Sequence, residues 1–135
     1  MPLTTRAIRL AMVALAVLAL AVALGIRAAS GTVLESANDL EQYSGTALYA
    51  SMVYAGVVFL RPRTAAWAAG TAAIGFCWAV ELFQLTGVPA TLSAHSVVAR
   101  LALGVAFDPT DLLWYPVGVV PLVVLDRLLN LRRTA

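Results

Sequence analysis

Four apolar segments, each about 20 residues long, restrict what this chain can fold into. They cover about residues 7–28, 40–60, 64–85 and 109–130. An α-helix needs about 20 mostly apolar residues to cross the hydrocarbon core of a bilayer. The chain is 61 % hydrophobic and 12 % charged, whereas soluble domains are about 45–50 % apolar and about 25 % charged. We therefore predict an all-α integral membrane bundle of four transmembrane helices, forming one domain over residues 1–135.

The first apolar segment also has features of a secretory signal peptide. Arginines precede it, and small residues follow it at 28–30. Arg27 would however lie inside the cleavage motif, and the unbroken apolar run from Leu10 to Ile26 exceeds the usual length of about 7–15 residues. We expect this segment to remain in place as a transmembrane helix.

Capping residues and prolines define the last helix. Asp108 is the predicted N-cap, with Pro109 at the first helical position and Asp111 at the third. Pro116 and Pro121 then remove hydrogen bonds inside this helix. Such prolines are tolerated in a membrane only if neighbouring helices or side chains satisfy the freed carbonyls, so we expect such partners here.

The segment before the last helix is too short and too interrupted to span a bilayer. Val98, Leu101 and Val105 can share one face of a helix within it. We predict one short interfacial or re-entrant helix over about residues 94–106.

The distribution of charge predicts the orientation of the bundle. With four spans, seven of the nine arginines fall at one end, and every carboxylate except Asp126 falls in the other half. Cytoplasmic loops carry an excess of Lys and Arg, so both termini are expected in the cytoplasm of a bacterial cell, with the bundle in its inner membrane. The arginines are scattered in ones and twos, so the net charge of +2 does not indicate a nucleic-acid partner.

Polar residues from several segments are expected at one depth, near the outer membrane surface. Seventeen steps of about 1.5 Å from Thr64 place Glu81 about 25 Å across a hydrocarbon core about 30 Å thick. Arg27 reaches a similar level from Arg9, and the last helix begins there. A carboxylate at this depth should face the bundle, either paired or protonated. This outer polar cluster comprises Arg27, Glu81, Gln84, His95, Arg100, Asp108, Asp111 and Tyr115.

Members of the outer polar cluster have structural explanations beside functional ones. A helix cap explains Asp108 without a function, and contact with lipid headgroups explains Arg27. His95 can be a solvated loop residue. For Glu81, an ion pair with Arg27 or Arg100 stands beside a role in binding or proton transfer. One histidine with dispersed carboxylates lacks metal-ligand spacing, and no P-loop, nucleophile elbow or dinucleotide-binding glycine pattern occurs. No metal and no cofactor is therefore expected.

Small residues recur every fourth position on the second and third apolar segments. This pattern is typical of closely packed membrane helices, although alanine is abundant in the chain as a whole. The two small-residue stripes comprise Ala47, Ser51 and Ala55 on the second segment and Ala65, Ala69 and Ala73 on the third.

Four motifs occur at residues 25–27, 43–54, 81–85 and 103–118. They resemble the patterns G-L-x-x-R, Y-x-G-D-x-L, E-x-x-Q-L and L-G-x-x-F-x-x-x-D-L-L-x-Y-x-x-G of the bacterial membrane family filed as domain of unknown function 2809. The resemblance extends over about residues 25–118, and the last motif is specific.

The chain departs from this family at two positions. Thr46 stands where the family's second motif has Asp, and an Arg often found after the third helix is replaced near Ser93, with Arg100 as the candidate substitute. A more distant resemblance is to the VanZ-like proteins, which are associated with resistance to glycopeptides such as teicoplanin. These resemblances imply four or five helices with a polar cluster near one membrane face, and no established reaction.

Three functions from different classes remain. The leading hypothesis is a membrane protein without enzymatic activity that binds an envelope lipid or a membrane partner through the outer polar cluster. The second is an enzyme acting on a lipid-linked headgroup, with Glu81 as general base and Arg27 or Arg100 holding an anionic group. A polar pocket open beside Glu81 favours this enzyme, whereas a buried Glu81 with protein partners on both oxygens opposes it.

The third hypothesis is a structural accessory subunit of a membrane complex. The small-residue stripes would then be the faces that dock onto the larger complex. The expected partners are membrane lipids, with another membrane protein or a second copy of the chain as the alternative, and no nucleic acid.

Overall fold

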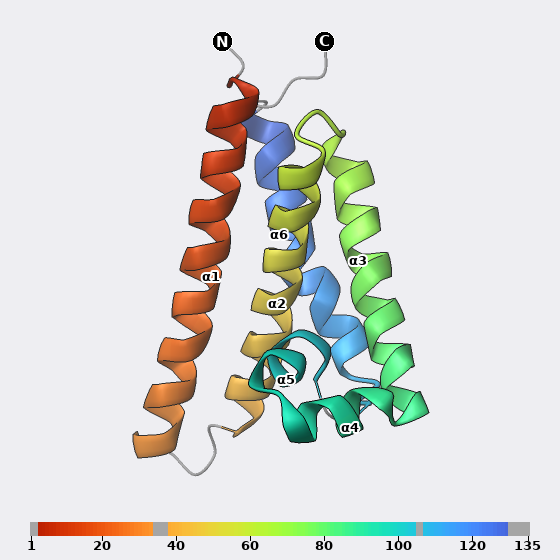
Figure 1. Ribbon diagram of the computed structural model, residues 1–135. Coiled ribbons are helices and arrows are strands. Elements are labelled where there is room, and N and C mark those ends of the chain that lie inside the picture. Colours follow the sequence, from red (N-terminus) through yellow and green to blue (C-terminus); the bar gives the residue numbers. More distant parts are fainter. Residues whose placement is uncertain (1–2, 34–37, 105–106, 130–135) are drawn as a thin grey trace.

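A computed structural model shows that the chain is all-helical in the residues it describes, which are 3–33, 38–104 and 107–129. The described residues form four long α-helices and two short ones. The long helices pack side by side, and the short ones lie at one end of this bundle (Figure 1). α1 begins and α6 ends at the opposite end. The long helices are α1 (Thr5–Val33), α2 (Asn38–Leu60), α3 (Ala66–Phe83) and α6 (Asp111–Leu129), and the short ones are α4 (Val88–His95) and α5 (Val97–Leu103).

Each long helix contains a stretch that is long and apolar enough to cross a membrane. These stretches are Thr5–Ala29, Gln42–Leu60, Ala66–Thr86 and Asp111–Leu129, close to the four predicted spans. Large apolar side chains on their outer faces are exposed, including Leu18 at 62 %. A surface of this kind suits contact with lipid and not with water. The prediction of an all-helical chain with four such helices is confirmed.

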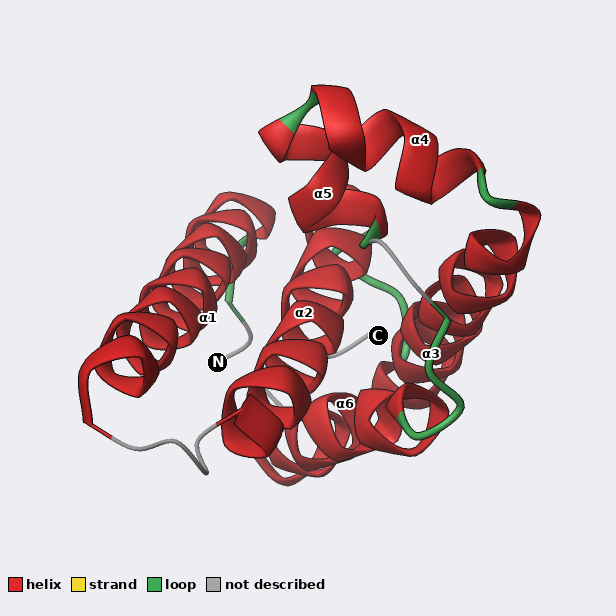
Figure 2. Cartoon of the chain, turned by 90° about the horizontal axis from the view of Figure 1, so that it is seen from below, coloured by secondary structure: helices red, strands yellow, loops and turns green. Residues whose placement is uncertain are grey.

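The segment that joins α3 to α6 contains two short α-helices. α5 lies within the predicted range of about residues 94–106, whereas α4 was not predicted. A 3-10 helix, η2 (Gln84–Thr86), follows α3, and Gly87, with φ of +80°, ends it. α4 begins at Val88. Ser96 is extended and its side chain accepts a hydrogen bond from the backbone N–H of Ala99 at 3.2 Å. Ser96 therefore ends α4 and caps a separate helix. Seen from this end of the bundle, the two helices lie one after the other beside the ends of the long helices (Figure 2).

The start of α6 follows from the predicted cap at Asp108. The side chain of Asp108 accepts a hydrogen bond from the N–H of Thr110 at 2.9 Å, and its carbonyl accepts one from the N–H of Asp111 at 3.0 Å. Residues 109 and 110 form a turn, and the α-helix begins at Asp111. The capping role of Asp108 is confirmed, and the helix starts two residues later than predicted.

Pro116 lies inside α6 and leaves the carbonyl of Leu112 without its usual helical donor. The indole Nε1–H of Trp78, on α3, donates to this carbonyl at 3.0 Å. This contact confirms the expectation that a neighbouring helix satisfies a carbonyl freed by a proline.

Substitution of Trp78 by Phe is expected to lower the free energy of unfolding by about 1 kcal/mol or more, because the carbonyl of Leu112 loses its donor. The thermal unfolding midpoint of the purified protein in detergent measures this effect. Trp67→Phe on the same helix is the matched control, since the Trp67 side chain is 63 % exposed. Equal midpoints for the two variants would contradict this role for the indole N–H.

The backbones of α2 and α6 approach each other closely at Gly118. The Ser51 hydroxyl donates to the carbonyl of Gly118 at 2.7 Å, and a Cβ at Gly118 would lie 1.8 Å from the carbonyl oxygen of Ala47. Ala69 and Ala73 of α3 are also fully buried. The small-residue stripes therefore pack inside the chain itself.

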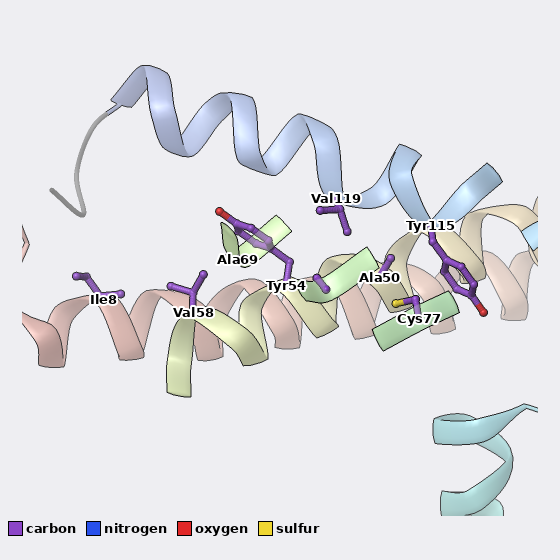
Figure 3. Close-up of a cluster of buried hydrophobic side chains, with 9 residues drawn as sticks. Ile8, Ala50, Tyr54, Val58, Ala69, Cys77, Tyr115 and Val119 are labelled. Carbon is purple, nitrogen blue, oxygen red and sulfur yellow. The ribbon is translucent and has the colours of Figure 1, made fainter. Parts of the chain in front are cut away.

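The buried core lies between α2, α3 and α6, and α1 contributes Ile8 (Figure 3). At the end where α1 begins, Arg9 donates to the carbonyl of Phe59 at 3.0 Å. Tyr54 donates to the carboxylate of Asp126 at 2.6 Å. The polar residues of interest here lie at the other end, beside α4 and α5.

Candidate functional site

Glu81, in the last turn of α3, has no solvent-exposed surface. Its Oε1 accepts a hydrogen bond from the backbone N–H of Asp108 at 2.7 Å, and its Oε2 accepts one from the Tyr115 hydroxyl at 2.6 Å. Each side-chain oxygen of Glu81 therefore has a hydrogen-bond partner within the protein. The Glu81 side chain thus joins the end of α3 to the beginning of α6.

Neither arginine expected beside Glu81 contacts it, so the ion pair is not found in the part of the chain that the structure describes. The Nη2 of Arg100 donates to the carbonyl of Ser93 at 3.2 Å. Arg27 is on α1, and α2 lies between α1 and α3 (Figure 2). Glu81 is therefore satisfied by a hydroxyl and a backbone N–H.

A cavity of about 220 Å³ opens beside this network, between α2, α5, α6 and the end of α3. We call it the polar cavity. Tyr115 is at its wall, while Glu81 is not among its lining residues. None of the described residues that line it is basic. The lining residues are Gln42, Gly45, Thr46, Tyr49, Val80, Gln84, Ala102, Leu103, Gly104, Asp111 and Tyr115.

Gln84 supplies the most informative atom of the polar cavity. Its Nε2 donates to the carbonyl of Leu103 at 2.5 Å, which fixes the orientation of the amide. Its Oε1 is buried and has no hydrogen-bond partner among the described residues. Buried polar atoms are nearly always satisfied. The Oε1 atom is therefore an unsatisfied acceptor on a residue that lines the polar cavity.

Gly104 allows Gln84 to approach α5 closely. Its φ is +72°, a conformation that favours glycine, and a Cβ there would lie 2.4 Å from the Gln84 Nε2. The Ser93 hydroxyl donates to the Gly104 carbonyl at 2.6 Å and holds this turn against α4. The amide of Gln84 is thus positioned by a turn that only glycine fits without strain.

Asp111 supplies the carboxylate of the polar cavity. It is half-buried, and its Oδ1 accepts a hydrogen bond from the Thr46 hydroxyl at 3.1 Å. The same hydroxyl lies 2.9 Å from the carbonyl of Gln42, a second acceptor for its proton. The Gln42 side-chain amide donates to Asp108. Side chains of α2 therefore hold the first turn of α6.

The structure divides the outer polar cluster into two groups. Arg27 lines a different and more apolar groove, between α1, α2 and α5. His95 is exposed at the end of α4, and Arg100 is exposed on α5. These three do not line the polar cavity. The members brought together at the cavity and its supporting network are Glu81, Gln84, Asp108, Asp111 and Tyr115.

Three polar residues of α2 that line the polar cavity were missed in the sequence. Gln42, Thr46 and Tyr49 follow one another at spacings of four and three residues, which places them on one helix face. This spacing of polar side chains within an apolar segment is the signal that could have found them. Gln42 and Thr46 face the start of α6, and the Tyr49 hydroxyl donates to the carbonyl of Ala102 at 2.7 Å.

The polar cavity is suited to a group that donates hydrogen bonds. Its lining residues include Gln84, whose Oε1 lacks a partner in the described chain, and Asp111, whose carboxylate has no lining cation to balance it. In the described part of the chain, no three His, Cys, Asp or Glu side chains are grouped so that they could hold a metal ion. Hydroxyl, amide or ammonium groups are the ligand chemistry that fits these acceptors.

A comparison with protein families finds one match. A model described as "Protein of unknown function (DUF2809)" matches residues 36–119. This range extends from the start of α2 to the middle of α6, so it includes every residue that lines the polar cavity. No curated protein and no solved structure matches the chain.

Proposed function

The chain belongs to the DUF2809 family, and on that premise we propose that it binds the polar headgroup of an envelope lipid in the polar cavity. The proposed location is the bacterial inner membrane, with several spans and both termini in the cytoplasm. The excess of arginine at the end where α1 begins and α6 ends supports this orientation. The polar cavity is then at the outer surface.

The observation that carries this proposal is the buried Gln84 Oε1 without a partner in the described chain. A buried acceptor left unsatisfied costs about 1–3 kcal/mol. A hydrogen-bond donor on a bound headgroup would remove this cost. Asp111, at the same wall, would attract a donor that carries positive charge.

Binding is favoured over catalysis because Glu81 is enclosed. A general base must be within hydrogen-bond reach of the proton it removes. Both Glu81 oxygens are bonded to protein donors, and the side chain does not line the polar cavity. Docking onto a larger complex through the small-residue stripes is also disfavoured, because Ser51, Ala55, Ala69 and Ala73 are buried within the chain.

Substitution of Gln84 by Met is expected to reduce the lipid retained by the purified protein about fivefold, the equivalent of one hydrogen bond of about 1 kcal/mol. Met has a similar length but cannot accept a strong hydrogen bond. Mass spectrometry of the lipid that co-purifies, normalised to folded protein by size-exclusion chromatography, measures the change.

His95→Ala is the control for the Gln84 experiment, because His95 is polar and near this end of the bundle but does not line the polar cavity. Its lipid content should equal that of the unmodified protein. Undiminished lipid in folded Gln84→Met protein would rule out the cavity as the headgroup site.

A further inference from the structure

A second cavity adjoins the polar cavity on the other side of α2. It is about 530 Å³ in volume and lies between α1, α2 and α5. Leu20 and Leu24 of α1, Met52 and Val53 of α2, and Val98 of α5 make most of its wall apolar. We call it the apolar groove. Its chemistry matches that of a hydrocarbon chain.

The two cavities share three wall residues: Gly45, Tyr49 and Ala102. The Tyr49 hydroxyl, bonded to the Ala102 carbonyl, stands between them. A Cβ placed on Gly45 would meet no atom within 4 Å, so the space beside this glycine is open. We take this open space, at a residue that lines both cavities, as the path by which one molecule extends from one cavity into the other.

The direction of the apolar groove matches that of a lipid in a bilayer. The seven helical steps from Leu20 to Arg27 correspond to about 10 Å along α1, and the eight steps from Gly45 to Val53 correspond to about 12 Å along α2. α1 ends at Val33 and α2 begins at Asn38, at the end of the bundle that carries α4 and α5 (Figure 1). By their positions along these helices, Arg27 and Gly45 are therefore nearer to that end than Leu20 and Val53 are. A chain in the groove would point into the membrane, with its polar end at the surface.

The volumes of the two cavities also indicate one ligand that occupies both of them. Small-molecule sites are commonly about 300–1,000 Å³. The apolar groove falls within this range, whereas the polar cavity, at about 220 Å³, is below it. The polar cavity fits a headgroup, and the remainder of the molecule needs the groove.

We propose that the apolar groove and the polar cavity together bind one phospholipid whose headgroup carries a primary ammonium, an inference that rests on the function proposed above. An acyl chain fills the groove, Arg27 attracts the phosphate, and the ammonium donates to Gln84 and Asp111. The order of groups along such a lipid is apolar chain, anion and cation. In the site, Arg27 lines the apolar groove together with the apolar side chains, and Asp111 lines the adjoining polar cavity.

The primary ammonium distinguishes this lipid from its relatives. A choline headgroup carries the same charge but has no N–H, so it leaves the Gln84 Oε1 unsatisfied. A glycerol headgroup offers hydroxyl donors but no positive charge to pair with Asp111. Phosphatidylethanolamine supplies both features.

The test compares three lipids on the full chain after purification in detergent and removal of bound lipid. Phosphatidylethanolamine, phosphatidylcholine and phosphatidylglycerol are added separately, and binding is followed by native mass spectrometry and by the unfolding midpoint. Phosphatidylethanolamine is expected to bind about tenfold more tightly than the other two, which corresponds to a charge-assisted hydrogen bond of about 1.4 kcal/mol. Asp111→Asn should remove most of this preference.

Two glycine variants distinguish an obstructed binding site from a general loss of stability. Gly45→Leu fills the passage between the two cavities and should abolish the binding of phosphatidylethanolamine. Gly56→Leu is the matched control on the same helix, since a Cβ there also meets nothing within 4 Å and Gly56 lines neither cavity. If Gly45→Leu does not fold, Arg27→Gln replaces it, with weaker binding of all three lipids expected.

Several results would overturn the proposal. Equal binding of the three lipids, preference for choline or glycerol headgroups, or full binding by folded Gly45→Leu would each exclude the assigned lipid and path. Stabilisation by water-soluble phosphoethanolamine but not by the lipid would refute the joint site and leave the proposed headgroup function standing. If neither the headgroup nor any of the lipids binds, both fail.

Discussion

Glu81→Ala is expected to lower the free energy of unfolding by about 3–5 kcal/mol, because it leaves two buried donors unsatisfied and opens a cavity. The two donors are the backbone N–H of Asp108 and the hydroxyl of Tyr115. Both are in or next to the start of α6, so the loss should loosen α6 from α3. The thermal unfolding midpoint in detergent, together with the yield of monodisperse protein, measures this effect.

Glu81→Gln is the informative comparison for the alanine variant. Its amide oxygen can still accept from the Asp108 N–H, and its amide nitrogen can donate to the Tyr115 oxygen. We expect Glu81→Gln to lower the free energy of unfolding clearly less than Glu81→Ala does. Combining Glu81→Ala with Tyr115→Phe should cost less than the two single changes added together, because they remove one shared hydrogen bond. Strict additivity, or an alanine variant as stable as the unmodified protein, would show that this network does not hold α6.

The predicted spans agree closely with the long helices because the bilayer imposes a strict requirement. Backbone groups in hydrocarbon must be satisfied within the helix, and only long apolar segments meet this condition. Asp108 and Pro116 also allowed correct predictions from the sequence. An Asp at a helix start can accept a hydrogen bond from a free backbone N–H, and a Pro inside a helix leaves a carbonyl without its donor. The Asp108 side chain accepts a hydrogen bond from the N–H of Thr110, and the indole N–H of Trp78 donates to the carbonyl that Pro116 leaves free.

The lateral arrangement of the polar residues could not be predicted in the same way. The helical rise gives the depth of a residue but not the direction in which it faces around the bundle. Arg27 and Glu81 were therefore assigned to one cluster by depth, although α2 separates their helices (Figure 2). The Gln84 side chain donates to the carbonyl of Leu103, the last residue of α5, and Gly104 ends this helix. No local pattern in the sequence predicts this contact.

The hydrogen bonds of Glu81 support the structure, whereas the polar cavity is the proposed binding site. Glu81 fixes the start of α6 through Asp108 and Tyr115, and this turn carries Asp111 at the cavity wall. Sites bind selectively when a supporting layer of contacts fixes the groups that touch the ligand. Glu81 is thus a positioning residue, while Gln84 and Asp111 would contact the lipid.

Gly118→Ala is expected to have the other large effect, a loss of about 3 kcal/mol or more in the free energy of unfolding. Its new Cβ would lie 1.8 Å from the carbonyl oxygen and 2.6 Å from the carbonyl carbon of Ala47. These are backbone atoms, so no side-chain rotation relieves the collision. α2 and α6 must separate, which also breaks the hydrogen bond from Ser51 to the Gly118 carbonyl.

The matched control for Gly118→Ala is Gly56→Ala on α2, where an added Cβ meets nothing within 4 Å. Alanine favours helix over glycine by about 1 kcal/mol, so this variant should be as stable as the unmodified protein or slightly more so. The two changes are chemically identical, and therefore their difference in unfolding midpoint isolates the contact between α2 and α6. Similar midpoints for both alanine variants would mean that the two helices do not meet backbone to backbone at Gly118.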